Sequence, residues 1–397
     1  MKHVCIIGGG LVGLGTAYAL RKKRPNLEIS LIEKEADVGK HQSTHNSGVL
    51  HCGLYYKPGS MKAKLAVTGI QEMSRFCQEY GIDHEICGKI VLATDNVEVE
   101  RLRELQRRGE ANGLEGIEWL EKDGIAEREP HAVGEAALLV PQEGIVDFAG
   151  VVRQLKQLLL ESGAVIITAT EVRRIREENN KQIVEWDEGS CRSDYVVNCA
   201  GLHSDRVARA AGLNPNCQII PFRGEYFTLS EKGQRLVNHL IYPTPDPALP
   251  HLGVHFTRMI HGGIEAGPNA VLAMKREGYR KTDFSFRDVF ESLTYRGFYR
   301  FLLSYPGASL GEVANSALKS IFLKNLQHLI PGIEVDDLAA GGGAGVRAQA
   351  IDREGKPLLD FAFEEAQGQL HVLNAPSPAA TASLVIGRHL AERVLSA

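Results

Sequence analysis

The most regular succession of apolar and polar stretches lies in the first thirty-odd residues. Lys2 to Ile7 is a short, apolar, β-prone run, Leu14 to Lys23 carries Ala and Leu at helical spacing, and Glu28 to Ile32 is a second β-prone run. Pro25 and Asn26 separate the helical stretch from the second run. The pattern predicts a strand, a helix and a second strand, in that order.

The turn between the first strand and the helix is Gly8-Gly9-Gly10-Leu11-Val12-Gly13, and the second strand ends on Glu33. This arrangement is typical of a dinucleotide-binding fold. Gly8 permits the tight turn, Gly10 lets a pyrophosphate approach the backbone, and Gly13 lets helix and strand pack closely. The helix start attracts phosphates, and Glu33 would accept hydrogen bonds from ribose hydroxyls. A glycine-rich turn without a ligand is the alternative, and the accompanying strands and acid argue against it.

Further along the chain, the same patterns predict more helices and strands. The predicted helices are Ser60 to Tyr80, Val99 to Arg108, Phe148 to Glu161 with Asp147 as its cap, and a final helix from Ala379. The predicted strands are Lys89 to Thr94, Gln182 to Trp186, Tyr195 to Cys199, Gly224 to Leu229, Gly253 to Thr257 and Leu370 to Leu373, with a strand and turn over Ala164 to Ile175.

Two stretches do not resemble a parallel α/β unit, because they combine antiparallel-type strands with turns such as the Pro-rich Pro243 to Pro250. We therefore expect an α/β fold (α+β in total) in which a substrate domain built on an antiparallel sheet interrupts a Rossmann-like domain twice. The expected cofactor domain comprises residues 1–85, 145–214 and 336–397, and the expected substrate domain comprises residues 86–144 and 215–335.

Composition narrows the class of protein without choosing a function. With 397 residues, 44% hydrophobic and 24% charged, the chain has the profile of a soluble globular protein of two domains. A net charge of −4 gives no indication of nucleic-acid binding. No apolar run approaches the roughly 20 residues that cross a bilayer, and the amino terminus leads directly into a strand, so no signal peptide is expected. Seven Cys without a CxxC pair predict reduced thiols, and fourteen His without HExxH spacing predict no metal site.

Two later segments suggest a ligand larger than a nicotinamide dinucleotide. The strand that ends in Asn198-Cys199-Ala200-Gly201 finishes on small residues, where backbone can touch a ligand. Asn374 to Thr381 leads into the final helix, whose start could direct its N–H groups at an electron-rich flavin ring. Taken alone, this second segment would be an ordinary Pro-containing helix start.

Together these pieces resemble the FAD-dependent D-amino acid oxidase superfamily, through GGGLVG with Glu33, the THNSG loop, VVNCAG and GVRAQAIDREGKPLLD. Longer strings are similar to the L-2-hydroxyglutarate dehydrogenase (oxidase) family, namely HNSGVLHCGLYYKPGSMKAKL, IPFRGEY, LGVHFTRM, GPNAVLAMKREGY, AGGGAGVRAQAIDREG and NAPSPAAT. The resemblance spans the whole chain. It implies FAD-dependent oxidation of L-2-hydroxyglutarate to 2-oxoglutarate.

The resemblance also implies that electrons pass to a membrane quinone pool, with oxygen as another acceptor, and that the protein lies in the cytoplasm, peripheral on the inner membrane. The rival hypothesis is a flavin-dependent amine or amino acid oxidase on the same scaffold. A flavin-binding sensor without turnover and a nicotinamide dehydrogenase are weaker alternatives.

The glycine pattern and the resemblance assign a set of FAD contacts. They are Gly8, Gly10, Val12, Gly13, Glu33, Lys34, Thr44, His45, Ser47, Gly48, Val172, Ala200, Gly201, Ala379, Ala380 and Thr381. His45 matches a residue that carries covalent FAD in related dehydrogenases. Because the narrower family is not generally described as covalent, we expect non-covalent FAD.

Oxidation of a 2-hydroxy acid requires a base near the hydroxyl, and His is the side chain best suited to it. His51 and His255 are the candidates, and His255 is preferred because it lies on an expected strand of the substrate domain. Either could instead be an ordinary core histidine. No Asp or Glu is comparably placed.

A substrate with two carboxylates requires cationic partners. Arg347 matches the superfamily's arginine that holds the substrate carboxylate. Lys275 and Arg258 are candidates for the distal carboxylate, whereas Arg223 could equally form an ion pair with Glu225. Tyr55 and Tyr56 are candidates for the wall of the site, although aromatic residues are more often core.

One aromatic-rich helical stretch could lie in a membrane interface. Its residues are Phe286, Val289, Phe290, Leu293, Phe298, Phe301 and Leu302, with Arg287, Arg296 and Arg300. Packing of these side chains against the substrate domain is the alternative.

Overall fold

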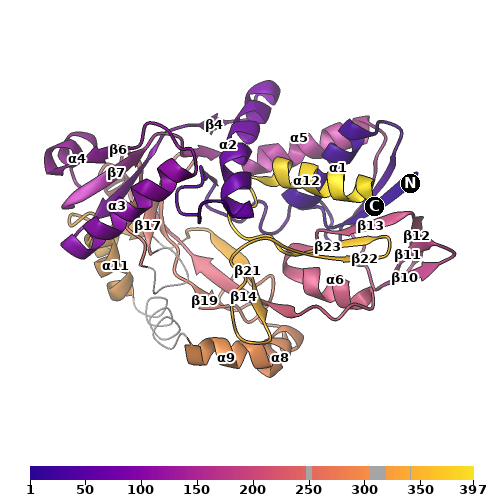
Figure 1. Ribbon diagram of the computed structural model, residues 1–397. Helices are drawn as coiled ribbons and strands as arrows, with labels where there is room; N and C mark the ends of the chain where they lie inside the picture. Colours follow the sequence, from indigo (N-terminus) through magenta and orange to yellow (C-terminus); the bar gives the residue numbers. More distant parts are fainter. Residues whose placement is uncertain (247–252, 305–318, 340) are drawn as a thin grey trace.

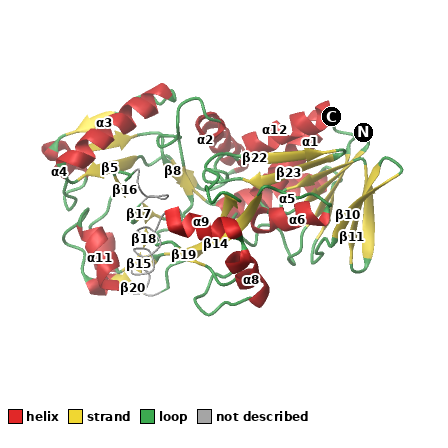
Figure 2. Cartoon of the chain, turned by 60° about the horizontal axis from the view of Figure 1, so that its bottom comes forward, coloured by secondary structure: helices red, strands yellow, loops and turns green. Residues whose placement is uncertain are grey.

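The computed structural model describes residues 1–246, 253–304, 319–339 and 341–397, so part of the predicted turn region Pro243 to Pro250 lies outside the described residues. Two large sheets lie toward opposite sides of the molecule, and both termini lie beside the first of them (Figures 1 and 2). Throughout the described ranges, no helix combines the length and the apolar character needed to cross a membrane.

The first sheet is the predicted dinucleotide fold. Its strand order is β22 (Ala362–Ala366), β23 (Gln369–Asn374), β13 (Tyr195–Asn198), β1 (His3–Ile7), β2 (Glu28–Ile32) and β9 (Val165–Ile167). All pairs are parallel except β22 with β23. The strand, helix and strand predicted at the amino terminus are confirmed as β1, α1 (Leu11–Lys23) and β2.

Successive side chains of β1 point to opposite faces of this sheet, and different elements cover the two faces. Val4 and Ile6 pack in the cluster that includes residues of the helices, whereas Cys5 and Ile7 pack against a small antiparallel sheet. The helices of this layer are α1, α2 (Met61–Tyr80), α5 (Phe148–Glu161) and α12 (Ser383–Ser396). The small sheet comprises β10 (Arg174–Glu178), β11 (Lys181–Trp186) and β12 (Gly189–Ser193).

The second sheet combines both of the expected excursions. Its order is β20 (Leu338–Ala339), β15 (Phe227–Leu229), β18 (Ile264–Gly267), β17 (His255–Arg258), β16 (Leu240–Pro243), β5 (Lys89–Ala93), β7 (Ala136–Val140) and β6 (Glu118–Leu120). β16 and β5, one from each excursion, form its parallel pair, and the other pairs are antiparallel. The mixed α/β fold class is confirmed, and the domain boundaries remain a prediction. The helices near the second sheet are α3 (Asn96–Ala111), α4 (Lys122–Arg128), α7 (Glu231–Gln234) and α11 (Lys319–Gln327).

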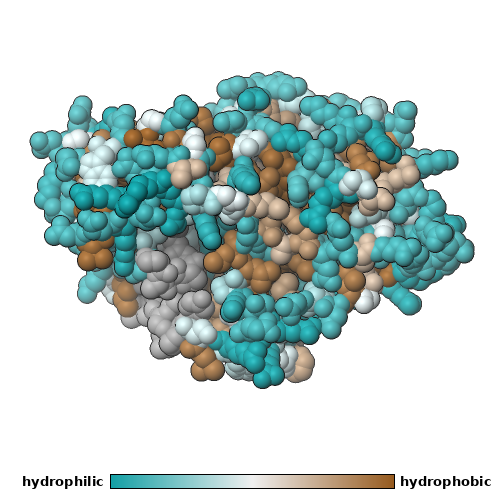
Figure 3. Space-filling view, viewed as in Figure 1, coloured by the Kyte–Doolittle hydropathy of each residue, from teal (hydrophilic) through white to brown (hydrophobic). Residues whose placement is uncertain are grey.

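Short ladders join the two halves. β14 (Cys217–Glu225) pairs along its length with β21 (Ala344–Asp352) and at one end with β19 (Val271–Leu272). β8 (Gly144–Val146) lies between β3 (Val49–Leu50) and β4 (His84–Glu85). α6 (Ser204–Ala210) follows β13, and α8 (Phe286–Thr294) and α9 (Arg296–Ser304) lie at the lower edge in Figure 1. Apolar side chains are visible at that edge in Figure 3.

Several predicted boundaries were wrong. The final helix begins at Ser383 rather than Ala379, because the preceding residues form turns. Asp147 occupies the cap position of α5 without a capping hydrogen bond, since its Oδ2 instead accepts one from Arg153 at 3.0 Å. The predicted strand over Ala164 to Ile175 is divided between β9 and β10.

Candidate active site

The glycine-rich turn is packed so closely that side chains are excluded from it. A Cβ on Gly8, whose φ is +106°, would lie 2.4 Å from the carbonyl oxygen of Cys199. A Cβ on Gly13 would lie 2.0 Å from the carbonyl oxygen of Gly8. These contacts keep the start of α1 at the carboxyl ends of β1 and β13, where the helix dipole favours a phosphate.

Glu33 is buried and held at the end of β2. Its Oε2 accepts a hydrogen bond from the Gly9 N–H at 2.7 Å, and its Oε1 accepts one from the Glu35 N–H at 2.9 Å. The carboxylate is therefore fixed beside the turn, where an adenosine ribose would meet it.

One cavity of about 870 Å³ runs from this turn to the second sheet. The residues assigned to FAD that line it are Gly8, Gly10, Val12, Glu33, Lys34, His45, Ser47, Val172, Ala200, Gly201, Ala379, Ala380 and Thr381. Its other end is lined by His51, His255 and Arg347. The size, the glycine cradle and the acid fit a dinucleotide cofactor.

Three residues assigned to FAD from the sequence lie outside the lining. Gly13 packs helix against strand, Thr44 donates its hydroxyl to the Gly39 carbonyl at 2.6 Å, and the N–H of Gly48 donates to Asn46 Oδ1 at 2.9 Å. Their roles in this geometry are to shape the loops around the cavity.

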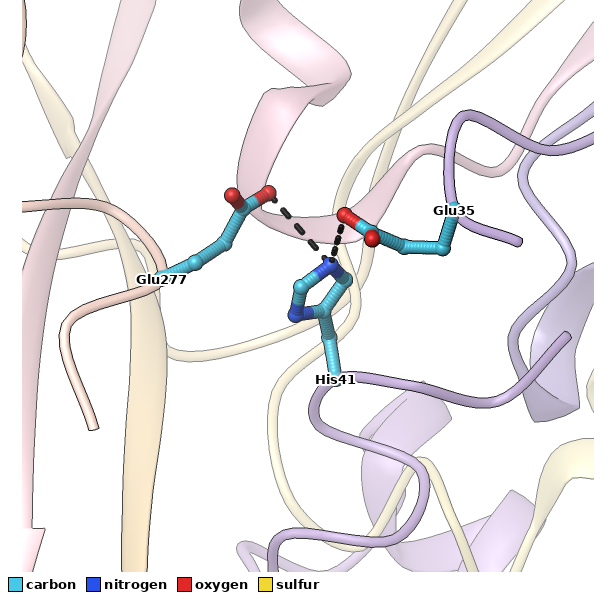
Figure 4. A group of neighbouring side chains, drawn as sticks. All are labelled: Glu35, His41 and Glu277. Atoms are coloured by element: carbon cyan, nitrogen blue, oxygen red, sulfur yellow. Dashed lines mark hydrogen bonds and ion pairs between the residues drawn. The ribbon is translucent and has the colours of Figure 1, made fainter. Parts of the chain in front are cut away.

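A charged group joins the dinucleotide loop to the second half of the chain. Nε2 of His41 lies 3.0 Å from Glu35 and 3.5 Å from Glu277, as Figure 4 shows. The spacing of these three side chains is compatible with a cation. Lys34 supplies that charge, because its Nζ pairs with Glu277 at 2.5 Å and also with Glu35.

His255 is buried in β17 with its ring stacked on Tyr242 at 3.8 Å between centroids. Its Nδ1 must donate to the Gly253 carbonyl at 2.9 Å, since a carbonyl only accepts, and Nε2 is left as an acceptor. Burial lowers the pKa of His255 to about 3, so this ring is a weak base.

His51 follows β3 and faces an acid. The register of β3 with β8 pairs Leu50 with Gly144, so His51 comes opposite Glu143, and its Nδ1 lies 3.4 Å from Glu143 Oε2. Burial lowers the pKa of His51, while the carboxylate of Glu143 acts in the opposite direction. No local pattern in the sequence indicates an acid beside His51.

Behind His51, Glu143 pairs with Lys89 at 2.9 Å, and both side chains are fully buried. Although burial alone raises the pKa of Glu143, Lys89 and His51 hold it at about 2. Sequence reasoning missed both residues, because single charges beside apolar runs ordinarily point to solvent.

Arg347, on β21 in register with Phe222, lines the cavity, and its role as the carboxylate clamp remains a prediction. Lys62, at the start of α2, lines it too, with Nζ 4.6 Å above the ring of Tyr56. Burial, with a contribution from Arg347, lowers the pKa of Lys62 to about 8. Lys62 could not be singled out from the sequence, because its string KPGSMKAKL carries several lysines.

The candidates for the distal carboxylate do not reach the cavity. Lys275 is absent from its lining, and the adjacent Arg276 is buried against Asp205. Arg258 is paired with Glu85 at 3.1 Å. Arg223 forms the alternative ion pair with Glu225 at 2.9 Å. Tyr55 and Tyr56 do line the cavity.

Comparison with known proteins identifies the class. A family model described as "FAD dependent oxidoreductase" matches residues 3–393. The chain belongs to this family, which confirms the predicted cofactor, FAD, and the prediction that the protein is an enzyme.

Relatives place the chain within that class. L-2-hydroxyglutarate dehydrogenase of Indibacter alkaliphilus is 46% identical over 394 residues, covering 99% of this chain and 98% of that protein. The enzyme of the same name from Escherichia coli K12 is 44% identical, covering 99% and 93%. The human mitochondrial enzyme is 41% identical, covering 98% and 88%. The chain therefore belongs to the L-2-hydroxyglutarate dehydrogenase family, as its sequence strings predicted.

Solved structures share the fold at lower identity. L-α-glycerophosphate oxidase from Mycoplasma pneumoniae, solved with FAD bound, is 22% identical with a TM-score of 0.80, covering 100% of this chain and 96% of that one. Glycine oxidase from Geobacillus kaustophilus is 20% identical with a TM-score of 0.74, covering 100% and 95%.

Proposed function

We propose that this enzyme oxidises L-2-hydroxyglutarate to 2-oxoglutarate. The relatives' names support this substrate, and one observation about the cavity carries it: two cations, Arg347 and Lys62, line it near His51, since Lys62 lowers the pKa of His51 and Arg347 lowers the pKa of Lys62. A 2-hydroxy dicarboxylate needs two cationic partners and one base, whereas an amino acid needs a single carboxylate clamp.

His51 is the better base of the two histidines. Its Nδ1 faces the carboxylate of Glu143, which stabilises the imidazolium that forms when Nε2 takes the substrate's hydroxyl proton. The described residues place no carboxylate in an ion pair with His255, whose Nε2 is suited to accepting a hydrogen bond. Bound FAD supplies the acceptor for the hydride that leaves the same carbon.

Arg347 is placed to hold the carboxylate next to the reacting carbon, and Lys62 the distal one. Replacing Lys62 tests this directly. In the Lys62→Met variant, flavin reduction by L-2-hydroxyglutarate should require at least about 10-fold more substrate, since a charge-assisted bond contributes about 1.5–3 kcal/mol. Reduction by L-2-hydroxyvalerate, which lacks the distal carboxylate, should change little.

Lys64→Met is the matched control, because Lys64 lies exposed on the same helix. Unchanged preference for the dicarboxylate in Lys62→Met would contradict the proposed role of Lys62. Flavin reduction by amino acids but not by hydroxy acids in the unaltered enzyme would favour the amino acid oxidase.

The electrons are proposed to pass to a membrane quinone, with oxygen as another acceptor, and the protein to lie peripherally on the cytoplasmic face of the inner membrane. The predicted aromatic stretch divides into two sets. Phe298 and Phe301 are buried against Ile220 and Ile351, which matches the packing alternative. Phe286 and Phe290 are 84% and 69% exposed on α8, the helix at the lower edge in Figure 1. This exposed set is the proposed membrane contact.

FAD binding is proposed to be non-covalent. His45 lines the cavity, but its ring is stacked on Tyr279 at 4.1 Å between centroids, and its Nδ1 lies 3.1 Å from the His41 carbonyl oxygen. These contacts fix the ring within the protein, so a covalent bond to the cofactor is not needed to position it. Acid precipitation should release all of the flavin into the supernatant, and yellow precipitate would contradict this proposal.

A further inference from the structure

His51, the proposed base, has a fully buried ion pair behind it. Glu143 and Lys89 each have no exposed surface, and neither lines the cavity. Exchanging such a pair for apolar residues is often neutral or stabilising, so stability does not explain why two charges are buried here.

The contacts of Glu143 are directed at the backbone and side chain around His51. Oε1 accepts hydrogen bonds from the N–H and the S–H of Cys52 at 3.3 and 3.2 Å. Oε2 lies 3.4 Å from His51 Nδ1 and 2.9 Å from Lys89 Nζ. A carboxylate at this position selects the tautomer with the proton on Nδ1 and leaves Nε2 as the acceptor.

Lys89 is held between aromatic rings. Its Nζ lies 4.0 Å from the ring centroid of Tyr242 and 5.1 Å from that of Tyr55. Tyr242 in turn stacks on His255. The ammonium is therefore fixed by cation–π contacts on one side and by Glu143 on the other.

We propose that Glu143 and Lys89 are a positioning pair for the base: Glu143 orients His51 and stabilises its imidazolium, and Lys89 holds the carboxylate of Glu143 in place. This inference rests on the proposed function. In the reaction, the substrate O–H bond breaks and its proton bonds to Nε2 of His51, the C–H hydride and its electron pair go to FAD, and a C=O bond forms. Glu143 takes no proton itself.

Several charged and titratable groups surround His51. Those that face it or its immediate neighbours are Glu143, Lys89, Lys62, His255, Arg347, Cys52 and Tyr55. Glu143 raises the pKa of His51, whereas Lys89 and Lys62 lower it. Removing Glu143 and removing Lys89 therefore have opposite expected effects on the titration of the base.

The test is anaerobic stopped-flow reduction of the FAD-loaded enzyme by L-2-hydroxyglutarate across pH. The rate falls at low pH as His51 gains its proton. Glu143→Gln should reduce the limiting rate on the order of 10-fold or more and move this fall to lower pH. Lys89→Met should move it to higher pH. The visible spectrum of the bound flavin should be retained in both variants.

Glu129→Gln is the matched control. Glu129 is also fully buried and lies 2.7 Å from a histidine nitrogen, His239 Nδ1, but neither residue lines the cavity. This variant should leave both the rate and the pH profile unchanged. The double variant Lys89→Met/Glu143→Gln carries no charge at either position, so it separates catalysis from folding, and it should be as slow as Glu143→Gln.

A Glu143→Gln or double variant with the unaltered enzyme's rate and pH profile would overturn the positioning role while leaving the proposed function intact. Shifts of the same direction in the two single variants would also overturn it. Absence of flavin reduction by L-2-hydroxyglutarate in the unaltered enzyme would instead reject the proposed function, and this inference with it.

Discussion

Burial decides how individual ionisable residues of the cavity behave. His255 and Lys62 both lose affinity for protons when removed from water, and their pKa values fall to about 3 and about 8. His51 is also buried, but it has a carboxylate beside it. His255 is therefore suited to accepting a hydrogen bond, Lys62 to binding an anion and His51 to taking a proton.

Substitution of the two histidines separates their roles. His51→Asn should lower the rate of flavin reduction by about 10²- to 10⁴-fold, because it removes the proposed general base. His255→Asn should cost less, since an amide can still provide a hydrogen-bonding group. Both rates are measured by stopped-flow on FAD-loaded protein. A larger loss in His255→Asn than in His51→Asn would assign the base to His255.

Lys62 predicts a pH dependence of substrate affinity. Its ammonium is the proposed partner of the distal carboxylate, and in the free enzyme it loses its proton as pH rises through about 8. The substrate concentration for half-maximal flavin reduction should therefore be constant below that pH and increase above it. L-2-Hydroxyvalerate should show no such increase, and neither should Lys62→Met. An increase of the same size with the monocarboxylate would contradict the assignment.

At the level of elements, glycines let two helices cross near the dinucleotide loop. A Cβ on Gly387 of α12 would lie 2.3 Å from backbone atoms of Gly15 in α1. Neither residue lines the cavity. A substitution at this helix crossing therefore tests packing independently of catalysis.

Gly387→Ala should destabilise the fold. The displaced backbone costs about 1–3 kcal/mol, which outweighs a gain of up to about 1 kcal/mol in helix propensity. Thermal unfolding of the apoprotein should show a lower midpoint. Gly332→Ala is the control, because the nearest atom to its Cβ would be 3.9 Å away. A midpoint equal to that of the control would show that α12 adjusts without cost.

The exposed face of α8 makes a prediction at the same scale. Phe286→Glu combined with Phe290→Glu should weaken binding to anionic phospholipid vesicles about 10-fold or more, since each buried Phe contributes about 1.5–3 kcal/mol. Flavin reduction should be unchanged. Val97→Glu, at an exposed position on α3, is the control. Equal vesicle binding by the double variant and the unaltered enzyme would contradict the proposed membrane contact.

The elements that the sequence predicts well are those with local signals. β1, the glycine turn, α1 and β2 are consecutive, and each has its own signal in the sequence. Asp147 shows the limit of such signals, because a residue of capping type instead pairs with Arg153. The start of α12 was likewise predicted too early, since turn residues and a helix's first turn have similar composition.

At the scale of the whole molecule, the active site depends on pairings between distant parts of the chain. Glu143 reaches His51 through β3 and β8, and Lys89 reaches Glu143 through β5 and β7. Nothing local in the sequence distinguishes Lys62, which lines the cavity, from Lys275, which does not. The glycine cradle and Arg347 could be predicted from motifs, whereas the second cation and the buried pair required the assembled fold.

The central claim is tested most directly by the visible spectrum of the purified holoenzyme under anaerobic conditions. Adding L-2-hydroxyglutarate should bleach the oxidised flavin band, and adding the D form should leave it unchanged. Bleaching by neither form, or by amino acids alone, would contradict the account.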